Sequence, residues 1–269
     1  MITLNGMVVS IDNFPDGTIL MKHNPGIYYN GTANLIDWDY ENDREFLALI
    51  YLVKHLRRLG RNNIELSMPY IPNARQDRVK NPEDVFTLKY FAELLNSLEL
   101  DKVTVLDPHS NVSEALINNV VVLKPTPYID AAIYDIQYQY GVSLDNLLMF
   151  YPDEGAAKRY SDMMKFPYAY GVKRRDWETG KIVGLDIIDN GNHLRNKDVL
   201  IVDDICSRGG TFYHSAKKLK ELGVNDIYLY VSHCENTILE GELLKGDLIK
   251  RVYTTDSIFT KSHEKVEVM

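Results

Sequence analysis

The sequence predicts an α/β protein of two similar domains, each built on a mainly parallel β-sheet flanked by helices. Short runs of β-branched or apolar residues alternate with segments whose apolar residues recur at helical spacing. Helices between successive strands supply the long crossovers that parallel strands require. The 269 residues are enough for two modest hydrophobic cores. We expect the boundary near residues 141–145, which gives domains of residues 1–142 and 143–269.

The expected elements follow one another in a regular order. The first half contains a helix at 44–59, a strand at 64–68, a helix at 86–98, a strand at 103–106 and a helix at 128–140. The second half contains strands at 147–151, 197–202 and 226–231, with a helix at 212–222 before the last of them. Gly60 suits the C-cap of the first helix. Right-handed crossovers place the loops after the strands along one carboxyl edge, where ligands bind.

The bulk composition excludes several classes of protein. Hydrophobic residues make up 45% and charged residues 25%, which is ordinary for a globular protein. The net charge of −8 argues against a general nucleic-acid binder. No apolar run approaches membrane-spanning length, and residues 1–13 lack the pattern of a signal peptide. The two cysteines, Cys206 and Cys234, argue against a disulfide framework and lack metal-ligand spacing. We expect a cytoplasmic protein with neither nucleic-acid nor membrane partners.

The most specific motif is the stretch 199–211, which reads Val-Leu-Ile-Val-Asp-Asp-Ile-Cys-Ser-Arg-Gly-Gly-Thr. Four apolar residues end in Asp203 and Asp204, and Gly209, Gly210 and Thr211 lead into the helix at 212–222. Backbone amides and the helix dipole at such a turn favour a phosphate, and glycines allow close approach and positive φ. The acids suit ribose hydroxyls or a magnesium ion. The alternative is a strand that ends in solvated acids before an ordinary glycine turn. The ordered combination of apolar run, acid pair, glycines, threonine and helix favours a ribose 5-phosphate site instead.

Further polar motifs follow strands or turns in the first half. Arg-Gln-Asp-Arg occupies 75–78, after the strand at 64–68, and offers guanidinium forks for phosphate and a glutamine for an adenine edge or a ribose hydroxyl. His109 follows the strand at 103–106, where it either binds a metal or hydrogen-bonds the backbone. Residues 14–18, Phe-Pro-Asp-Gly-Thr, form either a functional turn or merely a hairpin tip. The alternative for 75–78 is a solvated charged loop, but the position after a strand favours ligand contact.

Together these motifs carry a resemblance. Phe-Pro-Asp-Gly at 14–17, Ala-Arg-Gln-Asp-Arg at 74–78, Asp-Pro-His at 107–109, Pro-Asp-x-Gly at 152–155 and the motif at 199–211 occur in the order seen in ribose-phosphate pyrophosphokinases. The sequence resembles that family from about residue 14 to about residue 258. Its members have a type I phosphoribosyltransferase-like fold and move the terminal diphosphate of ATP onto the 1-hydroxyl of ribose 5-phosphate. Simple phosphoribosyltransferases share the phosphate loop but lack the string at 74–78.

The resemblance implies a role for each motif. The nucleotide ATP would be bound by Phe14 and Asp16 of a neighbouring subunit together with Arg75, Gln76 and Asp77. Magnesium would be bound by His109 and Asp153, and a flexible loop would carry the catalytic Lys173 and Arg175. The sugar phosphate would be bound by Asp203, Asp204, Ser207, Arg208, Gly209, Gly210 and Thr211. A site completed across subunits implies a homo-oligomer, either a dimer or a hexamer. For residues 173–175, a solvated basic patch is the simpler alternative.

One departure from the family concerns the acceptor. Ser207-Arg208 stands where the family usually has Asp-Thr. Arg208 either points to solvent or pairs with a charge that ribose 5-phosphate lacks, such as a second phosphate. ADP-ribose would offer that second phosphate and keep its free 1-hydroxyl. Ribose 5-phosphate is the first expectation because it is the family's usual acceptor, and ADP-ribose is the alternative.

Two other classes of protein compete with this interpretation. A true phosphoribosyltransferase would consume the activated sugar, but it has no need for the ATP-binding motif at 75–76. A non-catalytic regulatory relative would typically lose catalytic or metal-binding residues, whereas Lys173, Arg175, His109 and Asp203 are all present. A P-loop kinase is disfavoured because no Gly-x-x-x-x-Gly-Lys-Ser/Thr string occurs. The sequence therefore favours an ATP-dependent diphosphotransferase.

Overall fold

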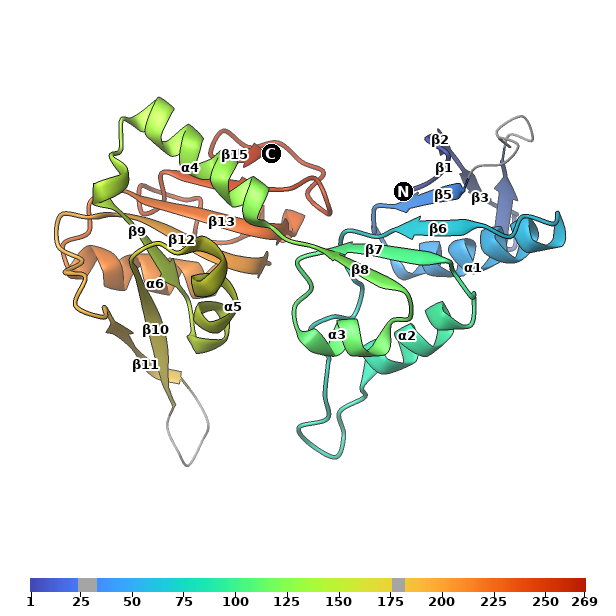
Figure 1. The fold of residues 1–269 in the computed structure, drawn as a ribbon, viewed down its shortest axis with the longest axis horizontal. Coiled ribbons are helices and arrows are strands. Elements are labelled where there is room, and N and C mark those ends of the chain that lie inside the picture. The colour runs from blue at the N-terminus through green and yellow to red at the C-terminus, as the bar shows by residue number, and fades with distance from the viewer. Residues whose placement is uncertain (24–32, 176–181) are drawn as a thin grey trace. The chain divides into compact units, whose positions relative to one another are not determined.

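The computed structural model describes residues 1–23, 33–175 and 182–269, and of residues 173–175 and 182–183 the backbone alone. The chain divides into two compact units, residues 1–124 and 125–269, and each contains its own sheet (Figure 1). The helix α4, Thr126–Tyr140, belongs to the second unit. The boundary that the sequence suggested, after residue 142, falls just behind this helix instead of before it. The reason is packing, because the apolar face of α4 is buried with residues of the second sheet.

The first unit is a six-stranded sheet in the order β2-β1-β5-β6-β7-β8. Its strands are β1 Ile2–Leu4, β2 Met7–Val8, β5 Asn34–Trp38, β6 Ile64–Ser67, β7 Lys102–Leu106 and β8 Val120–Leu123. The last four are parallel, and β1 pairs antiparallel with β2 and β5. The helices are α1 Asp43–Arg58, α2 Thr87–Asn96 and α3 Asn111–Leu116. A separate hairpin joins β3 Ser10–Asn13 to β4 Ile19–Lys22.

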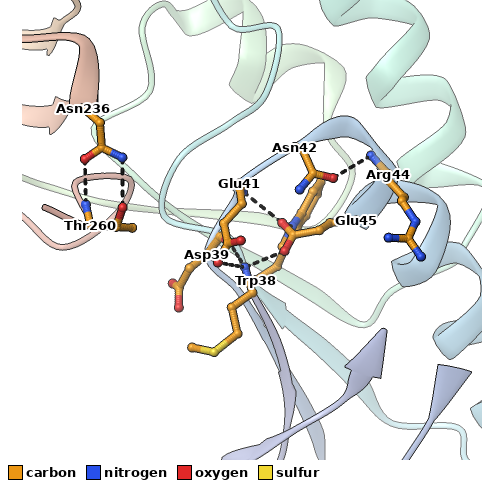
Figure 2. Close-up of polar contacts among 9 residues, drawn as sticks. Trp38, Asp39, Glu41, Asn42, Arg44, Glu45, Asn236 and Thr260 are labelled. Atoms are coloured by element: carbon orange, nitrogen blue, oxygen red, sulfur yellow. Dashed lines mark hydrogen bonds and ion pairs between the residues drawn. The ribbon is translucent and has the colours of Figure 1, made fainter. Parts of the chain in front are cut away.

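The start of α1 is fixed by polar contacts that the sequence encodes locally. Asn42 caps the helix, with its side chain accepting a hydrogen bond from the Arg44 N–H at 3.1 Å. Glu45 is buried and accepts hydrogen bonds from Trp38 Nε1 at 3.0 Å and from the Glu41 N–H at 2.9 Å (Figure 2). A buried carboxylate is stable only when its oxygens are satisfied, so these bonds tie the helix to the end of β5.

The second unit is a seven-stranded sheet in the order β11-β10-β9-β12-β13-β14-β15. Its strands are β9 Leu147–Tyr151, β10 Tyr168–Arg175, β11 Ile182–Ile188, β12 Asp198–Cys206, β13 Ile227–Cys234, β14 Arg251–Thr254 and β15 Val266–Val268. All neighbours are parallel except β10 and β11. The helices are α4, α5 Glu154–Met164 and α6 Gly210–Glu221, with short 3-10 turns η2 Leu144–Asn146 and η3 Asn236–Glu240.

The second sheet is covered on both faces. In β9, Leu148 and Phe150 share a buried cluster with α6, while Leu147, Met149 and Tyr151 share another with α4 and α5. Successive strand residues point to opposite faces, so a strand covered on both sides must be apolar throughout. This explains why the sequence shows unbroken apolar runs here, and every residue of β9 and β13 is buried.

The predicted fold class is confirmed, with local differences. The predicted helices and strands are present, but β12 runs through both acids to Cys206 and does not end before them. The elements that were not predicted are α3, α5, β8, the hairpin of β10 and β11, β14, β15, the short turns η2 and η3, and the first five strands. None of the helices in the described parts of the chain is long and apolar enough to cross a membrane.

Candidate active site

The carboxyl edge of the second sheet gathers most of the predicted sugar-phosphate residues. The strands β9 and β12 are parallel neighbours, so their carboxyl ends lie at the same edge. The strand β9 is followed by Pro152 and Asp153, and β12 carries Asp203 and Asp204 toward the loop that precedes α6. Burial, then Asp204 and, as the smallest contribution, the charge of Asp153 raise the pKa of Asp203.

The acid pair lies in an environment that disfavours two negative charges. Asp204 is buried and its N–H donates to Asp203 Oδ1 at 3.0 Å. Burial, followed by the neighbouring Asp204 carboxyl, raises the pKa of Asp203 well above its ordinary value. Arg159, on α5, places Nη1 3.6 Å from Asp204 Oδ1 and offsets part of the charge. A ligand that brings hydroxyl donors or a cation would relieve the remaining repulsion.

Arg159 was not predicted from the sequence. It lies on α5, six positions after Asp153, in a helix whose apolar residues are mostly alanine, tyrosine and methionine. The available signal was Asp153 itself, because its side chain accepts from the Ala156 N–H at 3.1 Å as a helix N-cap. A cap at that position starts a helix, and its apolar residues pack in the core with the second sheet. Recognising the cap would have predicted α5.

The predicted metal ligands can be judged by their chemistry. Magnesium is usually held by one or two carboxylates together with substrate phosphates, and it prefers oxygen ligands. Asp153 and the acid pair supply such oxygens at one sheet edge. In the described parts of the chain, no three His, Cys, Asp or Glu side chains gather as a complete site. The donor set therefore fits a magnesium ion that a phosphate ligand helps to hold.

The phosphate loop has the geometry of an anion-binding turn. Gly209 has a φ of 74° and precedes α6, and Gly210 and Thr211 are exposed on the first turn of the helix. The first amides of a helix have no partner within it, so they can donate to a phosphate. A Cβ on Gly209 would lie 2.8 Å from Leu243 Cδ2, whereas one on Gly210 would meet nothing within 4 Å. Within the protein itself only Gly209 is required to be glycine, and the role of Gly210 in close approach to a phosphate stays a prediction.

The two remaining loop residues are held by acids from the segment after β13. Ser207 Oγ donates to Glu235 Oε1 at 2.9 Å. Arg208 Nη2 donates to Glu240 Oε2 at 3.0 Å, and the Arg208 side chain is 73% exposed. Both partners are about 30 residues further along the chain and were not identified from the sequence. Arg208 thus lies at the surface and in an ion pair.

In the first unit, the structure joins two of the predicted nucleotide and metal motifs. Asp77 is buried, and Arg78 binds it through two hydrogen bonds of 2.8 and 2.9 Å. Arg78, then Ser110 and the charge of His109, lower the pKa of Asp77 to about 2. The residues 75–78 and 109–110 therefore lie together at the carboxyl edge of β6 and β7. Asp77 anchors this arrangement.

The neighbouring side chains are available at the surface. Arg75 and Gln76 are exposed, and the Gln76 Oε1 accepts a hydrogen bond from Thr87 Oγ1 at 2.7 Å. His109 is partly buried. Exposed side chains that follow a parallel strand are positioned for ligand contact, and the Thr87 bond fixes the orientation of the Gln76 amide.

The motif at 14–18 is the tip of the hairpin formed by β3 and β4. The Phe14 N–H donates to the Thr18 carbonyl at 2.9 Å, and the Gly17 N–H donates to the Phe14 carbonyl at 2.9 Å. Asp16 accepts from the Thr18 hydroxyl at 2.7 Å and from its N–H at 3.0 Å, and these bonds lower the pKa of Asp16. The Phe14 ring is 48% exposed. The turn is therefore rigid and presents an aromatic ring to the surface.

The predicted catalytic residues lie in a strand. The backbones of Lys173 and Arg175 belong to β10, opposite Leu185 and Ile182 of β11. The sequence suggested a flexible loop at this position, and that part of the expectation was wrong because the backbone here pairs with β11. Their side chains, and residues 176–181, lie outside the described part of the structure.

Comparison with known proteins shows which proteins this chain resembles. No protein-family model matches the chain. It is 24% identical over 265 residues to ribose-phosphate pyrophosphokinase 2 of Enterococcus faecalis, covering 96% of this chain and 78% of that one. It is 27% identical over 231 residues to the ribose-phosphate pyrophosphokinase of Bacillus subtilis, covering 84% and 69%. The solved phosphoribosylpyrophosphate synthetase of Mycobacterium smegmatis superimposes with a TM-score of 0.79 at 16% identity, covering 97% and 85%.

The fold is thus that of an α/β protein with two mainly parallel sheets, as in the synthetase structure. The chain is distantly similar to ribose-phosphate pyrophosphokinases, and the similarity extends over most of its length. The resemblance that the sequence predicted is therefore confirmed.

Proposed function

We propose that the protein transfers the β,γ-diphosphate of ATP to the anomeric 1-hydroxyl of a ribose 5-phosphate moiety and releases AMP. The observation that carries the proposal is the sheet edge where Asp153, Asp203 and Asp204 meet beside the turn at Gly209. Carboxylates accept hydrogen bonds from vicinal hydroxyls, and the amides at the start of α6 accommodate a phosphate. This is the pattern of groups that a ribose 5-phosphate requires.

The nucleotide would be bound in the first unit. Arg75 offers a guanidinium for phosphate oxygens, and Gln76 offers an amide for an adenine edge or a ribose hydroxyl. Asp77 and Arg78 form the base of this arrangement, and His109 lies beside them. Because Asp77 is already paired with Arg78, its role would be to position the neighbouring side chains rather than to bind ATP directly.

Residues of this chain would perform three tasks in the reaction. Asp203 and Asp204 would hold the ribose hydroxyls, which fixes the orientation of the 1-hydroxyl toward the β-phosphorus. Lys173 and Arg175 would stabilise the negative charge that develops on the transferred phosphates, as fixed cations do best in the transition state. Asp153 would help to hold magnesium in the second unit, and His109 would contribute to a magnesium site at the nucleotide in the first unit. When bound, magnesium supplies positive charge that offsets the charge of the phosphates.

The proposal is tested by measuring AMP release from ATP with purified protein and magnesium, in parallel reactions with and without ribose 5-phosphate. We expect AMP to form only when the acceptor is present. A Lys173→Ala variant should lower kcat by at least about tenfold, because it removes one fixed cation. Release of AMP in the absence of acceptor, or of ADP in its presence, would contradict diphosphoryl transfer.

A second acceptor is favoured by one observation. Arg208 adjoins the phosphate turn and is 73% exposed, so it can reach a group that extends from the 5-phosphate. ADP-ribose carries such a group and keeps its 1-hydroxyl. If Arg208 reads the second phosphate, Arg208→Thr should shift the ratio of kcat/KM values toward ribose 5-phosphate. An unchanged ratio would leave ribose 5-phosphate as the acceptor.

The nucleotide site would be completed by another copy of the chain. The rigid turn that presents Phe14 is suited to stack its ring on an adenine from outside the subunit. We therefore propose a homo-oligomer, and mass photometry of the purified protein would detect it. Phe14→Ala should raise the KM for ATP and leave the KM for the acceptor unchanged. A monomer with full activity would exclude a shared site.

A further inference from the structure

The segment that follows β13, residues 235–243, lies directly against the phosphate loop, and we call it the backing segment. Its backbone is joined to the end of β12 by a hydrogen bond from the Glu235 N–H to the Cys206 carbonyl at 2.8 Å. A Cβ on Gly241 would lie only 1.9 Å from the Arg208 carbonyl oxygen. No other residue fits at Gly241 without moving one backbone away from the other. The spacing between segment and loop is therefore fixed.

The backing segment is anchored independently of any ligand. Ile238 and Leu243 are fully buried in the core beneath α6. Asn236 is tied to Thr260 by two hydrogen bonds, one from its Nδ2 to the threonine hydroxyl at 2.9 Å and one from the threonine N–H to its Oδ1 at 3.0 Å (Figure 2). These contacts hold the backbone that carries Glu235 and Glu240. The two acids are thus presented to the loop from a fixed platform.

The two acids differ in how firmly they hold the loop. Glu235 binds Ser207 and also accepts from Thr237 Oγ1 at 3.0 Å, and all three side chains are partly buried. The pair of Arg208 and Glu240 is exposed, with 73% and 59% of the side chains accessible. Exposed ion pairs contribute little net free energy because water screens them. The Glu235 contact is therefore structural, while Glu240 can be exchanged for another anion.

We propose that Glu240 is a specificity-determining residue that competes with a second phosphate of the acceptor for the Arg208 guanidinium. This inference rests on the proposed function. An acceptor with a single 5-phosphate is held by the amides at the start of α6 and leaves the ion pair intact. An acceptor that extends beyond this phosphate must displace Glu240 before Arg208 can bind it. A guanidinium binds phosphate through two parallel hydrogen bonds, which favours binding of the second phosphate. Breaking the ion pair between Arg208 and Glu240 reduces this gain.

The chain offers a matched control for this proposal. Glu242 lies two positions away, is 66% exposed and pairs with Lys245 at 2.8 Å. It carries the same charge in a comparable ion pair, but its partner is not in the loop. Comparing Glu240→Gln with Glu242→Gln therefore separates the specific competition from the general effect of removing one negative charge near the site.

The test is isothermal titration calorimetry of the full chain with ADP-ribose and with ribose 5-phosphate, at physiological salt with magnesium present. Because exposed ion pairs are worth only fractions of a kcal/mol, Glu240→Gln should tighten ADP-ribose binding by about 1.5- to 5-fold. It should leave the Kd for ribose 5-phosphate unchanged, and Glu242→Gln should change neither Kd. AMP release should show the same pattern in the KM values.

Each other outcome overturns a defined part of the account. Equal changes for both acceptors, or no change for either, would overturn the role of Glu240 while leaving the proposed function intact. An effect of Glu242→Gln as large as that of Glu240→Gln would also overturn it, because the effect would then be general electrostatics. If neither compound bound to any variant, the proposed function would fail together with the inference.

Discussion

Replacing Arg159 by methionine tests whether its positive charge stabilises the folded protein by offsetting the charge of the buried Asp204. The change removes the guanidinium 3.6 Å from Asp204 Oδ1 and keeps a flexible apolar stem of similar length. Asp204 would remain with 5% of its side chain exposed and would lose this compensating charge. Removing one partner of a buried pair is costly because the other charge stays buried.

The magnitude follows from the separation and the exposure. At an effective dielectric constant of 20, two charges 3.6 Å apart attract with about 5 kcal/mol, which is an upper bound. Arg159 is 25% exposed, so solvent screens part of this attraction, and its own desolvation is recovered in the variant. We expect a net loss of about 2 kcal/mol, between the values for exposed and for buried pairs. For a unit of this size the melting temperature should fall by about 4–8 °C.

The assay is a double-mutant cycle with Arg159→Met, Asp204→Asn and the combined variant, followed by urea denaturation. The loss caused by Arg159→Met should shrink to below about 0.5 kcal/mol once Asp204 is neutral. Lys158→Met is the control, because Lys158 is exposed on the same helix and should change stability by less than about 0.5 kcal/mol. The reasoning is refuted if Arg159→Met costs as much in the Asp204→Asn background as in the original protein.

Three further predictions concern stability. Burial and a neighbouring carboxyl raise the pKa of Asp203, so ionising this side chain costs folding free energy as pH rises through that pKa. Asp203→Asn should therefore raise the melting temperature at pH 8. The same variant should weaken ribose phosphate binding. Gly209→Ala should cost about 1–3 kcal/mol because of its positive φ and the close approach of Leu243, whereas Gly210→Ala should cost nothing in the same thermal melt. Glu45→Ala should cost about 2–4 kcal/mol in urea denaturation, since the buried Trp38 Nε1 and the partly buried Glu41 N–H lose their acceptor.

Each of these has a result that would count against it. For Asp203→Asn, the gain in melting temperature should become smaller as the pH falls toward the ordinary pKa of an aspartate. A gain in melting temperature that does not depend on pH would contradict the raised pKa as its cause. Equal losses for Gly209→Ala and Gly210→Ala would show that the loop conformation is not what requires glycine. A loss below about 0.5 kcal/mol for Glu45→Ala would mean that water replaces the carboxylate.

The sequence predicted the buried strands of the second sheet well because such strands are apolar on both faces. The strand at 147–151 was predicted with its observed bounds for this reason. The strand β12 was predicted four residues too short, since its last residues include two acids that interrupt the apolar run. The acid pair and the glycine turn nonetheless lie at the carboxyl end of this strand, as the sequence predicted. Local pattern is sufficient where burial on both faces determines composition.

The contacts of the candidate site could not be predicted in the same way. Arg208 and Glu240 are 32 residues apart, and no local periodicity links them. Their pairing depends on where the backing segment lies after β13, which the close approach at Gly241 determines. Arg159 was missed because α5 was not predicted, although its N-cap was visible as Asp153. Tertiary geometry, not propensity, decides these interactions.

The central claim is that a diphosphoryl group, rather than a single phosphate, moves to the sugar. The most direct measurement uses ATP labelled with ³²P at the β-phosphate, incubated with the protein, magnesium and ribose 5-phosphate or ADP-ribose, with separation of the products by chromatography. The account predicts that the label leaves the nucleotide and appears in the sugar product, in equal amount to the unlabelled AMP formed. Label retained in ADP, or released as free diphosphate without a sugar product, would contradict it.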